Sequence, residues 1–252
     1  MAGLQGWARQ NGPFLISLVL LALVWEMVGR TANLMTLPPL SSVLAAFVRL
    51  WASGDITAPL FDSTLALIYG LVISLVFGSL LGIGIGLSRF VEVALGPYVK
   101  AGLSAPMIAF VPVFLMIFGI GSETRIATVV AFSIFIVATN AATAMRASDP
   151  RLVEMAQSFG ASRWTIFTDV RLPAGAPYFL AGLRLGVARG VKGLINGEVL
   201  IAIIGLGGLV KKYGTVFSMD QLYAVILLIV IYAAVAVGLV SALSRLIVVE
   251  EK

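Results

Sequence analysis

The chain has 252 residues, of which 60% are hydrophobic and only 12% are charged, whereas an ordinary soluble domain has about 25% charged residues. Its mean hydropathy is +1.06. A soluble globule of this size has too little interior to bury that much apolar surface, so the composition predicts a polytopic membrane protein. The same numbers exclude disordered, fibrous and disulfide-rich secreted classes.

The chain contains neither Cys nor His. Thiol nucleophiles, disulfides, Cys/His zinc sites and Ser–His–Asp triads are therefore excluded. The 12 Asp and Glu residues are scattered, so we expect no catalytic residue, metal or cofactor in this chain. The net charge is +5, but the basic residues flank apolar runs, which is typical of membrane topology and not of a nucleic-acid surface.

Six apolar stretches are long enough to cross a bilayer, since each span needs about 20 residues. We expect an all-α helical bundle of about six transmembrane helices in a single domain over residues 1–252, with spans at 13–30, 60–88, 99–120, 124–147, 176–204 and 222–248. The first stretch contains Glu26 and is followed by no small-residue cleavage site. We therefore interpret it as a retained span and not as a signal peptide.

Proline and glycine predict the irregular parts. Leu37-Pro38-Pro39 prevents a continuous helix after the first span, and Ser41 or Ser42 is expected to cap a short interfacial helix that ends near Trp51. Small residues at intervals of three and four in the second span predict close helix packing; the glycines of this span are Gly70, Gly78, Gly82, Gly84 and Gly86. Pro106 and Pro112 predict a kinked or broken third span. Glycines at 205, 207 and 208 predict a flexible turn before the last span.

Charge bias predicts the orientation, because Lys and Arg are more frequent in cytoplasmic segments. If both termini are cytoplasmic, the inside segments hold Arg9, Arg89, Lys100, Arg146, Arg151, Arg163, Arg171, Arg184, Arg245 and Lys252, and the outside segments hold only Arg30, Arg49, Arg125, Lys211 and Lys212. We therefore expect cytoplasmic termini and a cytoplasmic loop at 149–173.

The polar loop at 149–173 has the pattern of two short helices. Asp149 and Pro150 suit the N-cap and first position of a helix that runs through Ser158, and Gly160 can adopt the left-handed conformation that ends it. Ser162 is expected to cap a second short helix.

The second loop helix carries Trp164, Ile166 and Phe167, and Leu172-Pro173 is expected to stop it. Apolar side chains outside the lipid usually mark a protein contact. The alternative is that Trp164 and Phe167 rest at the bilayer interface, where aromatic residues are enriched.

The loop resembles a known family signature. Glu154-Met155-Ala156, three residues, Gly160, nine residues and then Val170-Arg171-Leu172-Pro173 resemble the EAA motif of ABC importer permeases, which reads Glu-Ala-Ala, three residues, Gly, nine residues and Ile-x-Leu-Pro. Met155 and Val170 depart mildly from this pattern.

Other segments resemble the nitrate/sulfonate/taurine-type permeases, over roughly residues 35 to 245. They are Leu37-Pro38-Pro39 with Ser42-Val43-Leu44, Ala105-Pro106, Val111-Pro112, Phe118-Gly119-Ile120-Gly121, Leu180-Ala181-Gly182-Leu183-Arg184-Leu185 and Gly197-Glu198. An Arg that is usual early in the second span is missing near Ala66 or Leu67, so its role does not carry over.

This resemblance implies a permease subunit with a type I ABC importer fold in the bacterial inner membrane. A second permease subunit, expected to be an identical copy, would complete the solute pathway, and an external or periplasmic solute-binding protein would deliver the cargo. The Gly-rich strings of this chain lack the Lys of a phosphate-binding loop, so the ATPase must be a separate chain. The resemblance implies that two copies of it would bind ATP and Mg and would dock on the loop. The implied coupling residues are Glu154, Ala156, Gly160, Trp164, Phe167, Leu172 and Pro173.

The fifth span carries a polar stripe. Arg189, Lys192 and Asn196 fall within about 60° of one another on a helix, and an intramembrane cation normally faces a cavity or a partner. One interpretation is a pathway for a small polar or anionic solute, with Asn140 and Glu198 as further candidates. The other is an ion pair with Glu198 or Glu26, or a contact with the second subunit.

An ion-gradient-driven secondary transporter is the competing function, with Glu26 or Glu198 as the relay. No inverted repeat supports this alternative, and it would leave the loop at 149–173 without a role. An intramembrane enzyme or a structural scaffold is disfavoured by the absence of His, Cys and any carboxylate cluster. The pattern does not identify the cargo.

Overall fold

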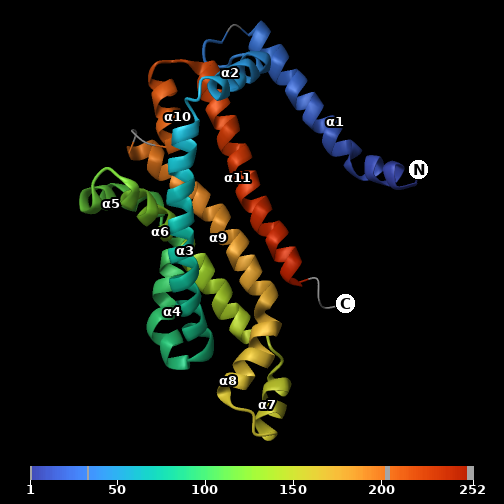
Figure 1. Ribbon diagram of the computed structural model, residues 1–252, viewed down its shortest axis with the longest axis vertical. Helices are drawn as coiled ribbons and strands as arrows, with labels where there is room; N and C mark the ends of the chain where they lie inside the picture. Colours follow the sequence, from blue (N-terminus) through green and yellow to red (C-terminus); the bar gives the residue numbers. More distant parts are fainter. Residues whose placement is uncertain (1, 33, 202–204, 249–252) are drawn as a thin grey trace.

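The computed structural model describes residues 2–32, 34–201 and 205–248 (Figure 1). Every regular element in these ranges is a helix, as expected for an all-α protein. In chain order they are α1 (Ala2–Thr31), α2 (Leu40–Ala52), α3 (Thr57–Leu87), α4 (Arg89–Ser104), η1 (Met107–Phe110), α5 (Val111–Phe118), α6 (Ser122–Arg146), α7 (Pro150–Ser158), α8 (Arg163–Thr165), η2 (Ile166–Arg171), α9 (Leu172–Ile201), α10 (Gly205–Thr215) and α11 (Met219–Val248).

Within the described ranges, α3, α6 and α11 are each long and apolar enough to cross a bilayer. Two bent pairs, α4 with the helices that follow it and the α8–α9 segment with α10, raise the number to five if each is one span. Helix α1 covers the predicted first span and leaves the bundle at the corner that it forms with α2 (Figure 1). The count of six spans therefore stays a prediction, and residues 202–204 of the predicted fifth span lie outside the described ranges.

Helices α3, α6 and α9 form the centre of the bundle because glycines let their backbones approach. A Cβ added at Gly70 would lie 2.5 Å from Val129 Cβ, and one added at Gly82 would overlap the carbonyl oxygen of Ala138 on α6. The buried hydroxyl groups of Ser74 and Ser133 lie 2.7 Å apart across the same contact. The predicted close packing is confirmed for four glycines of the second span, Gly70, Gly78, Gly82 and Gly86, but not for Gly84, where an added Cβ would meet only Val91 Cγ1 at 3.4 Å.

The third span is broken at Pro106, as predicted, but Pro112 does not interrupt it and its first helix begins earlier than predicted. Helix α4 begins at Arg89, ten residues before the predicted start of the span, because the Ser88 side chain accepts a hydrogen bond from the Val91 N–H. The chain then bends by 95° between Ser104 and Met107. Pro106 lies at this break, whereas Pro112 lies in the first turn of α5, where a missing N–H costs no helical hydrogen bond.

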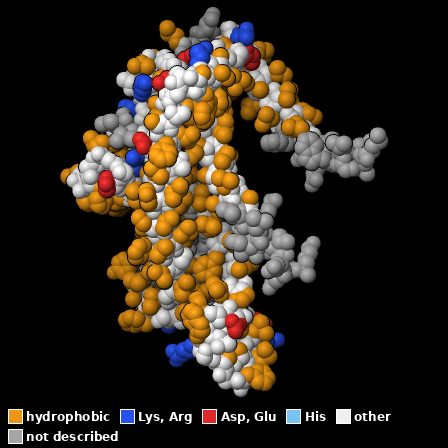
Figure 2. Space-filling model, viewed as in Figure 1, with side chains coloured by type: hydrophobic (Ala, Val, Ile, Leu, Met, Phe, Trp, Pro, Cys, Tyr) orange, Lys and Arg blue, Asp and Glu red, His pale blue; other side chains and the backbone are white. Residues whose placement is uncertain are grey.

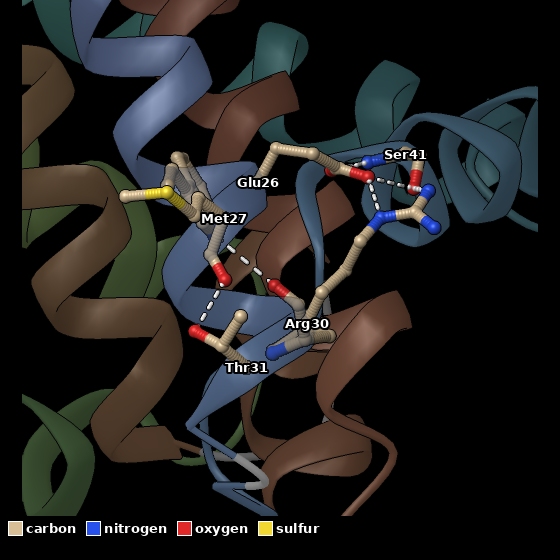
Figure 3. A network of polar contacts seen from close by, with 7 residues as sticks. Glu26, Met27, Arg30, Thr31 and Ser41 are labelled. Carbon is tan, nitrogen blue, oxygen red and sulfur yellow. Dashed lines mark hydrogen bonds and ion pairs between the residues drawn. The ribbon is translucent and has the colours of Figure 1, made fainter.

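Two further local predictions were wrong. Helix α2 is preceded by Pro39 and has no side-chain cap; the backbone N–H and hydroxyl of Ser41 instead donate to the carboxylate of Glu26 on α1 (Figure 3). The glycines at 205, 207 and 208 do not form a flexible turn. They are buried in the first turn of α10, packed against α9.

The α3–α6 contact can be tested with two neighbouring glycines. Gly82→Ala is expected to lower the free energy of unfolding by about 1–3 kcal/mol, because the new methyl group overlaps α6. Gly84→Ala is the matched control: its Cβ would meet only Val91 Cγ1, at 3.4 Å, and alanine favours the helix by up to about 1 kcal/mol. Thermal unfolding in detergent measures both. Equal midpoints for the two variants would contradict the packing account.

Candidate functional site

The loop helix α7 has the caps that its sequence predicts. The Asp149 carboxylate accepts a hydrogen bond from the Arg151 N–H at 2.9 Å, and Pro150 occupies the first turn. Gly160 has a φ of +76°, and the N–H of Ala161 donates to the Ala156 carbonyl at 3.0 Å. These are the features of a helix that ends at a left-handed glycine.

The second half of the loop continues into the membrane helix without a break. The Ser162 hydroxyl accepts from the Thr165 N–H at 3.1 Å, as predicted. The prediction that Leu172-Pro173 stops this helix was wrong, because the π-helix η2 leads directly into α9. Pro173 has no N–H to donate, so one backbone hydrogen bond of a regular α-helix cannot form there. The π-helix lies just before this position, and such wider turns occur where the hydrogen-bond pattern of a helix is interrupted.

Large apolar side chains are exposed at this end of the molecule, which lies opposite the α1–α2 corner (Figure 1). Leu152 and Met155 are exposed on α7, and Phe159, the C-cap residue that follows α7, is 85% exposed. On the neighbouring turn Trp164 is 71% exposed and its ring lies 5.5 Å from that of Phe167. We call Leu152, Met155, Phe159 and Trp164 the apolar tip; Figure 2 shows hydrophobic side chains among charged ones at this end.

The apolar tip differs in part from the residues that the sequence suggested. Trp164 is exposed as expected, Phe167 is half-buried beneath it, and Ile166 is only 6% exposed, so Ile166 packs inward and is no surface anchor. The sequence interpretation missed Leu152, Met155 and Phe159. Their spacing of three and four residues was the signal that could have identified them.

The remaining loop residues lie between the apolar tip and the bundle. Glu154 is exposed and lines a cavity of about 350 Å³ behind α7, together with Arg146 of α6 and Arg171 of η2. Arg171 also donates to the Met145 carbonyl at 3.2 Å. Ala156 is half-buried on α7, and Leu172 and Pro173 are exposed at the start of α9. The loop is therefore tied to the end of α6 as well as to α9.

Two of the predicted pathway residues share a cavity. Arg189 and Lys192 line a space of about 300 Å³ together with residues of α4, η1 and α6. Among the described residues, neither has an acidic side chain within ion-pair distance. Asn196 is half-buried and is not part of this lining. Asn140 lies at the α6–α9 contact, where its amide donates to the Ile136 carbonyl at 2.8 Å.

Glu198 lies elsewhere, in a buried polar knot at the start of α10. Its carboxylate is fully buried and accepts from the Ser63 hydroxyl at 2.7 Å and from the Gly207 N–H at 3.0 Å. The Ser63 hydroxyl in turn accepts from the Leu206 N–H. Arg125 Nη1 lies 3.6 Å from the carboxylate. The side chains of Ser63 and Glu198 therefore accept hydrogen bonds from N–H groups at the N-terminus of α10 that have no partner within the helix.

Arg125, which the charge bias assigns to an external segment, is buried beside Glu198. The ion pairs that were the alternative for Arg189 and Lys192 are not formed with Glu26 or Glu198 in the described structure, because Glu26 pairs with Arg30 at 2.5 Å (Figure 3). Sequence reasoning missed Ser63 and Arg125, which are distant from Glu198 along the chain.

Comparison with known proteins gives a consistent result. The family model described as "Binding-protein-dependent transport system inner membrane component" matches residues 74–249. The chain is 33% identical over 229 residues to the putative aliphatic sulfonates transport permease SsuC of Escherichia coli, covering 90% of this chain and 86% of SsuC. It is 27% identical over 160 residues to the riboflavin transport system permease RibX of Chloroflexus aurantiacus, covering 64% of this chain and 60% of RibX.

The fold is also found among solved structures. An inward-facing structure of the MetNI methionine ABC transporter matches with a TM-score of 0.60 at 20% identity, covering 80% of this chain and 96% of the matched chain. The family model and the similarity to SsuC define the class of protein as a transport permease. The chain belongs to the binding-protein-dependent transport permeases, the inner-membrane components of ABC importers. Membership implies association with ATPase subunits and a solute-binding protein.

The buried knot gives a second prediction. Glu198→Ala is expected to lower the free energy of unfolding by about 3–5 kcal/mol, because Arg125 is left as an uncompensated buried charge. Removing that charge as well, in Arg125→Met with Glu198→Ala, should recover part of the loss. Glu123→Ala, which truncates an exposed carboxylate on α6, is the control and should leave the thermal midpoint unchanged. A Glu198→Ala midpoint equal to that of the control would refute a structural role for the knot.

Proposed function

We propose that this chain is one of two identical permease subunits of an importer whose separate ATPase subunits bind ATP and Mg²⁺ and dock on the loop at 149–173. Both termini and this loop would lie in the cytoplasm, and an external solute-binding protein would deliver a small polar or anionic solute. The apolar tip is the observation that carries the proposal. Exposed residues such as Phe159 and Trp164 stand outside the bundle on short, capped helices, as expected for a surface that a partner covers.

The connection between the loop and the bundle supports a rigid-body mechanism. Because η2 runs into α9 and Arg171 is bonded to the end of α6, a displacement of α7 and α8 would move both helices. Glycines 175 and 182 of α9 pack against α6 without room for side chains. Closure of an ATPase dimer by ATP would thus rotate packed helices as a unit instead of bending a flexible linker.

Glu154 is proposed to hold α7 in place against the bundle. Its position at the cavity lined by Arg146 and Arg171 supports attraction to these two cations. The carboxylate is exposed, so a basic residue of the ATPase could also reach it in the assembled transporter.

Arg189 and Lys192 are proposed to line the solute pathway. Two cations beside one cavity, without an acidic partner among the described residues, favour an anionic group on the cargo. The names of the relatives refer to aliphatic sulfonates and to riboflavin, so they do not agree on one cargo for this chain.

Gly160 provides the test of coupling. Gly160→Val is expected to lower transport by about tenfold while ATP hydrolysis continues, because a β-branched residue at positive φ costs about 1–2 kcal/mol and displaces the turn. Added bulk is not the cause, since no atom lies within 4 Å of the Cβ position. The measurement is cargo uptake per ATP hydrolysed in reconstituted vesicles.

Gly160→Asn is the matched control, because asparagine tolerates the left-handed conformation. It should keep most of the coupled transport. Full coupling in the Gly160→Val variant would show that the loop conformation does not matter and would count against the proposal.

Lys192 tests the pathway. Lys192→Gln is expected to raise the KM for an anionic cargo by about tenfold, the effect of losing one charge-assisted hydrogen bond. Arg184→Gln removes an exposed charge from the same helix outside the cavity and should change little. Unchanged transport and cargo preference in Lys192→Gln would remove the pathway interpretation while leaving the coupling role intact.

A further inference from the structure

A separate cavity opens between α4 and α6, at the end of the bundle that carries the loop. Its volume is about 540 Å³, which is large enough for the polar group of an organic ligand. Three cationic side chains line it, from Arg89, Lys100 and Arg146, together with the single carboxylate of Glu92. The lining therefore has a net positive charge.

The Glu92 carboxylate does not neutralise this cavity, because it pairs with Arg89 and Arg146 and leaves the charge of Lys100 unpaired. Arg89 Nη1 lies 2.8 Å and Arg146 Nη1 lies 3.2 Å from the two Glu92 oxygens. Arg146 is also fixed by a hydrogen bond to the Ile85 carbonyl at 2.8 Å. Lys100 is exposed and has no acidic partner among the described residues. The guanidinium groups are thus held in place, and one ammonium group is free to bind an anion.

The other wall of the cavity is apolar. It is formed by Val93, Val99, Leu103, Ala138 and Ala142. Val99 and Ala138 belong to the buried core cluster that joins α3, α4 and α6. On the outer face of α4, Phe90 is 81% exposed and Tyr98 is 72% exposed. Tyrosine and tryptophan are enriched at the level of lipid headgroups, so Tyr98 suits that level. A ligand of this cavity would therefore meet cations on one side and hydrocarbon on the other.

The hydroxyl groups in the lining do not favour a neutral ligand. Thr139 donates its hydroxyl hydrogen to the Phe135 carbonyl and Thr143 donates to the Thr139 carbonyl. Neither is left with a donor for the cavity, so the available donors are the cationic groups. Such groups bind phosphate oxygens well.

We propose that the cavity between α4 and α6 binds the phosphate of an anionic phospholipid, with Lys100 as the main contact and the acyl chains along the apolar wall. Basic pockets between transmembrane helices on the cytoplasmic side are suited to such headgroups. The proposal rests on the proposed function only for the cytoplasmic position of this end. Arg146 lines both this cavity and the one behind α7, so a bound lipid would also lie next to the coupling loop.

Native mass spectrometry of the full-length chain in detergent tests the site with two lipids that have the same acyl chains, phosphatidylglycerol and phosphatidylcholine. The wild type should bind phosphatidylglycerol more tightly. Lys100→Gln should weaken that binding about fivefold, the effect of one Lys near an anionic headgroup. Lys100→Arg should retain it. Lys211→Gln, an exposed lysine of α10 at the other end, should match the wild type, and phosphatidylcholine binding should not change.

Equal phosphatidylglycerol binding by the wild type and Lys100→Gln would overturn the proposal, as would an equal loss in Lys211→Gln. A titration with inorganic phosphate distinguishes the source of the anion. If phosphate raises the thermal midpoint of the wild type but not that of Lys100→Gln, and the two lipids bind alike, the ligand is a soluble anion and the lipid assignment is wrong. Lipid binding is measured without ATP or cargo, so its failure and a failure of coupling are distinguishable.

Discussion

The rest of the structure depends on the close approach of α3, α6 and α9. Lipid provides no hydrophobic force that pushes helices together, so association relies on van der Waals contact between small residues. Gly70 and Gly82 of α3 and Gly175 of α9 supply this contact with α6, at distances that leave no room for a Cβ. Helices α3, α6 and α9 are therefore expected to move as one rigid unit. It is the frame to which both broken helices and the loop are attached.

A bilayer also requires that each backbone polar group in it be satisfied by protein. At the N-terminus of α10, side chains from α3 and α9 meet this requirement for two backbone groups: the Leu206 N–H donates to Ser63 and the Gly207 N–H donates to Glu198. Arg125 places a compensating charge beside the carboxylate. Glu198, which the sequence offers as a transport relay, is thus held by contacts that stabilise the fold. The cavity lined by Arg189 and Lys192 does not include it.

Local signals predicted local structure well. The helix caps of the loop depend only on residues that are close in the sequence, so they could be predicted from spacing alone. They are formed by Asp149, Gly160 and Ser162. Predictions failed where distant segments decide. Pro173 lies inside a continuous helical segment, because the π-helix η2 runs directly into α9 at this point. The partners of Glu198 come from α3, α6 and α10, and a single sequence carries no signal of that proximity. The apolar tip lies between these cases, since its spacing was visible but its exposure was not.

The proposed function requires that an ATPase subunit bind the loop at 149–173 from the cytoplasm. Because the natural chain has no cysteine, Phe159→Cys creates a single attachment point on the apolar tip for a photo-crosslinker, and Phe90→Cys places one on an equally exposed phenylalanine outside it. In membrane vesicles of defined orientation, the account predicts an adduct between position 159 and the ATPase subunit, formed only when the cytoplasmic face is accessible, and none from position 90. Labelling of position 159 from the external face, or no ATPase adduct in the intact transporter, would contradict it.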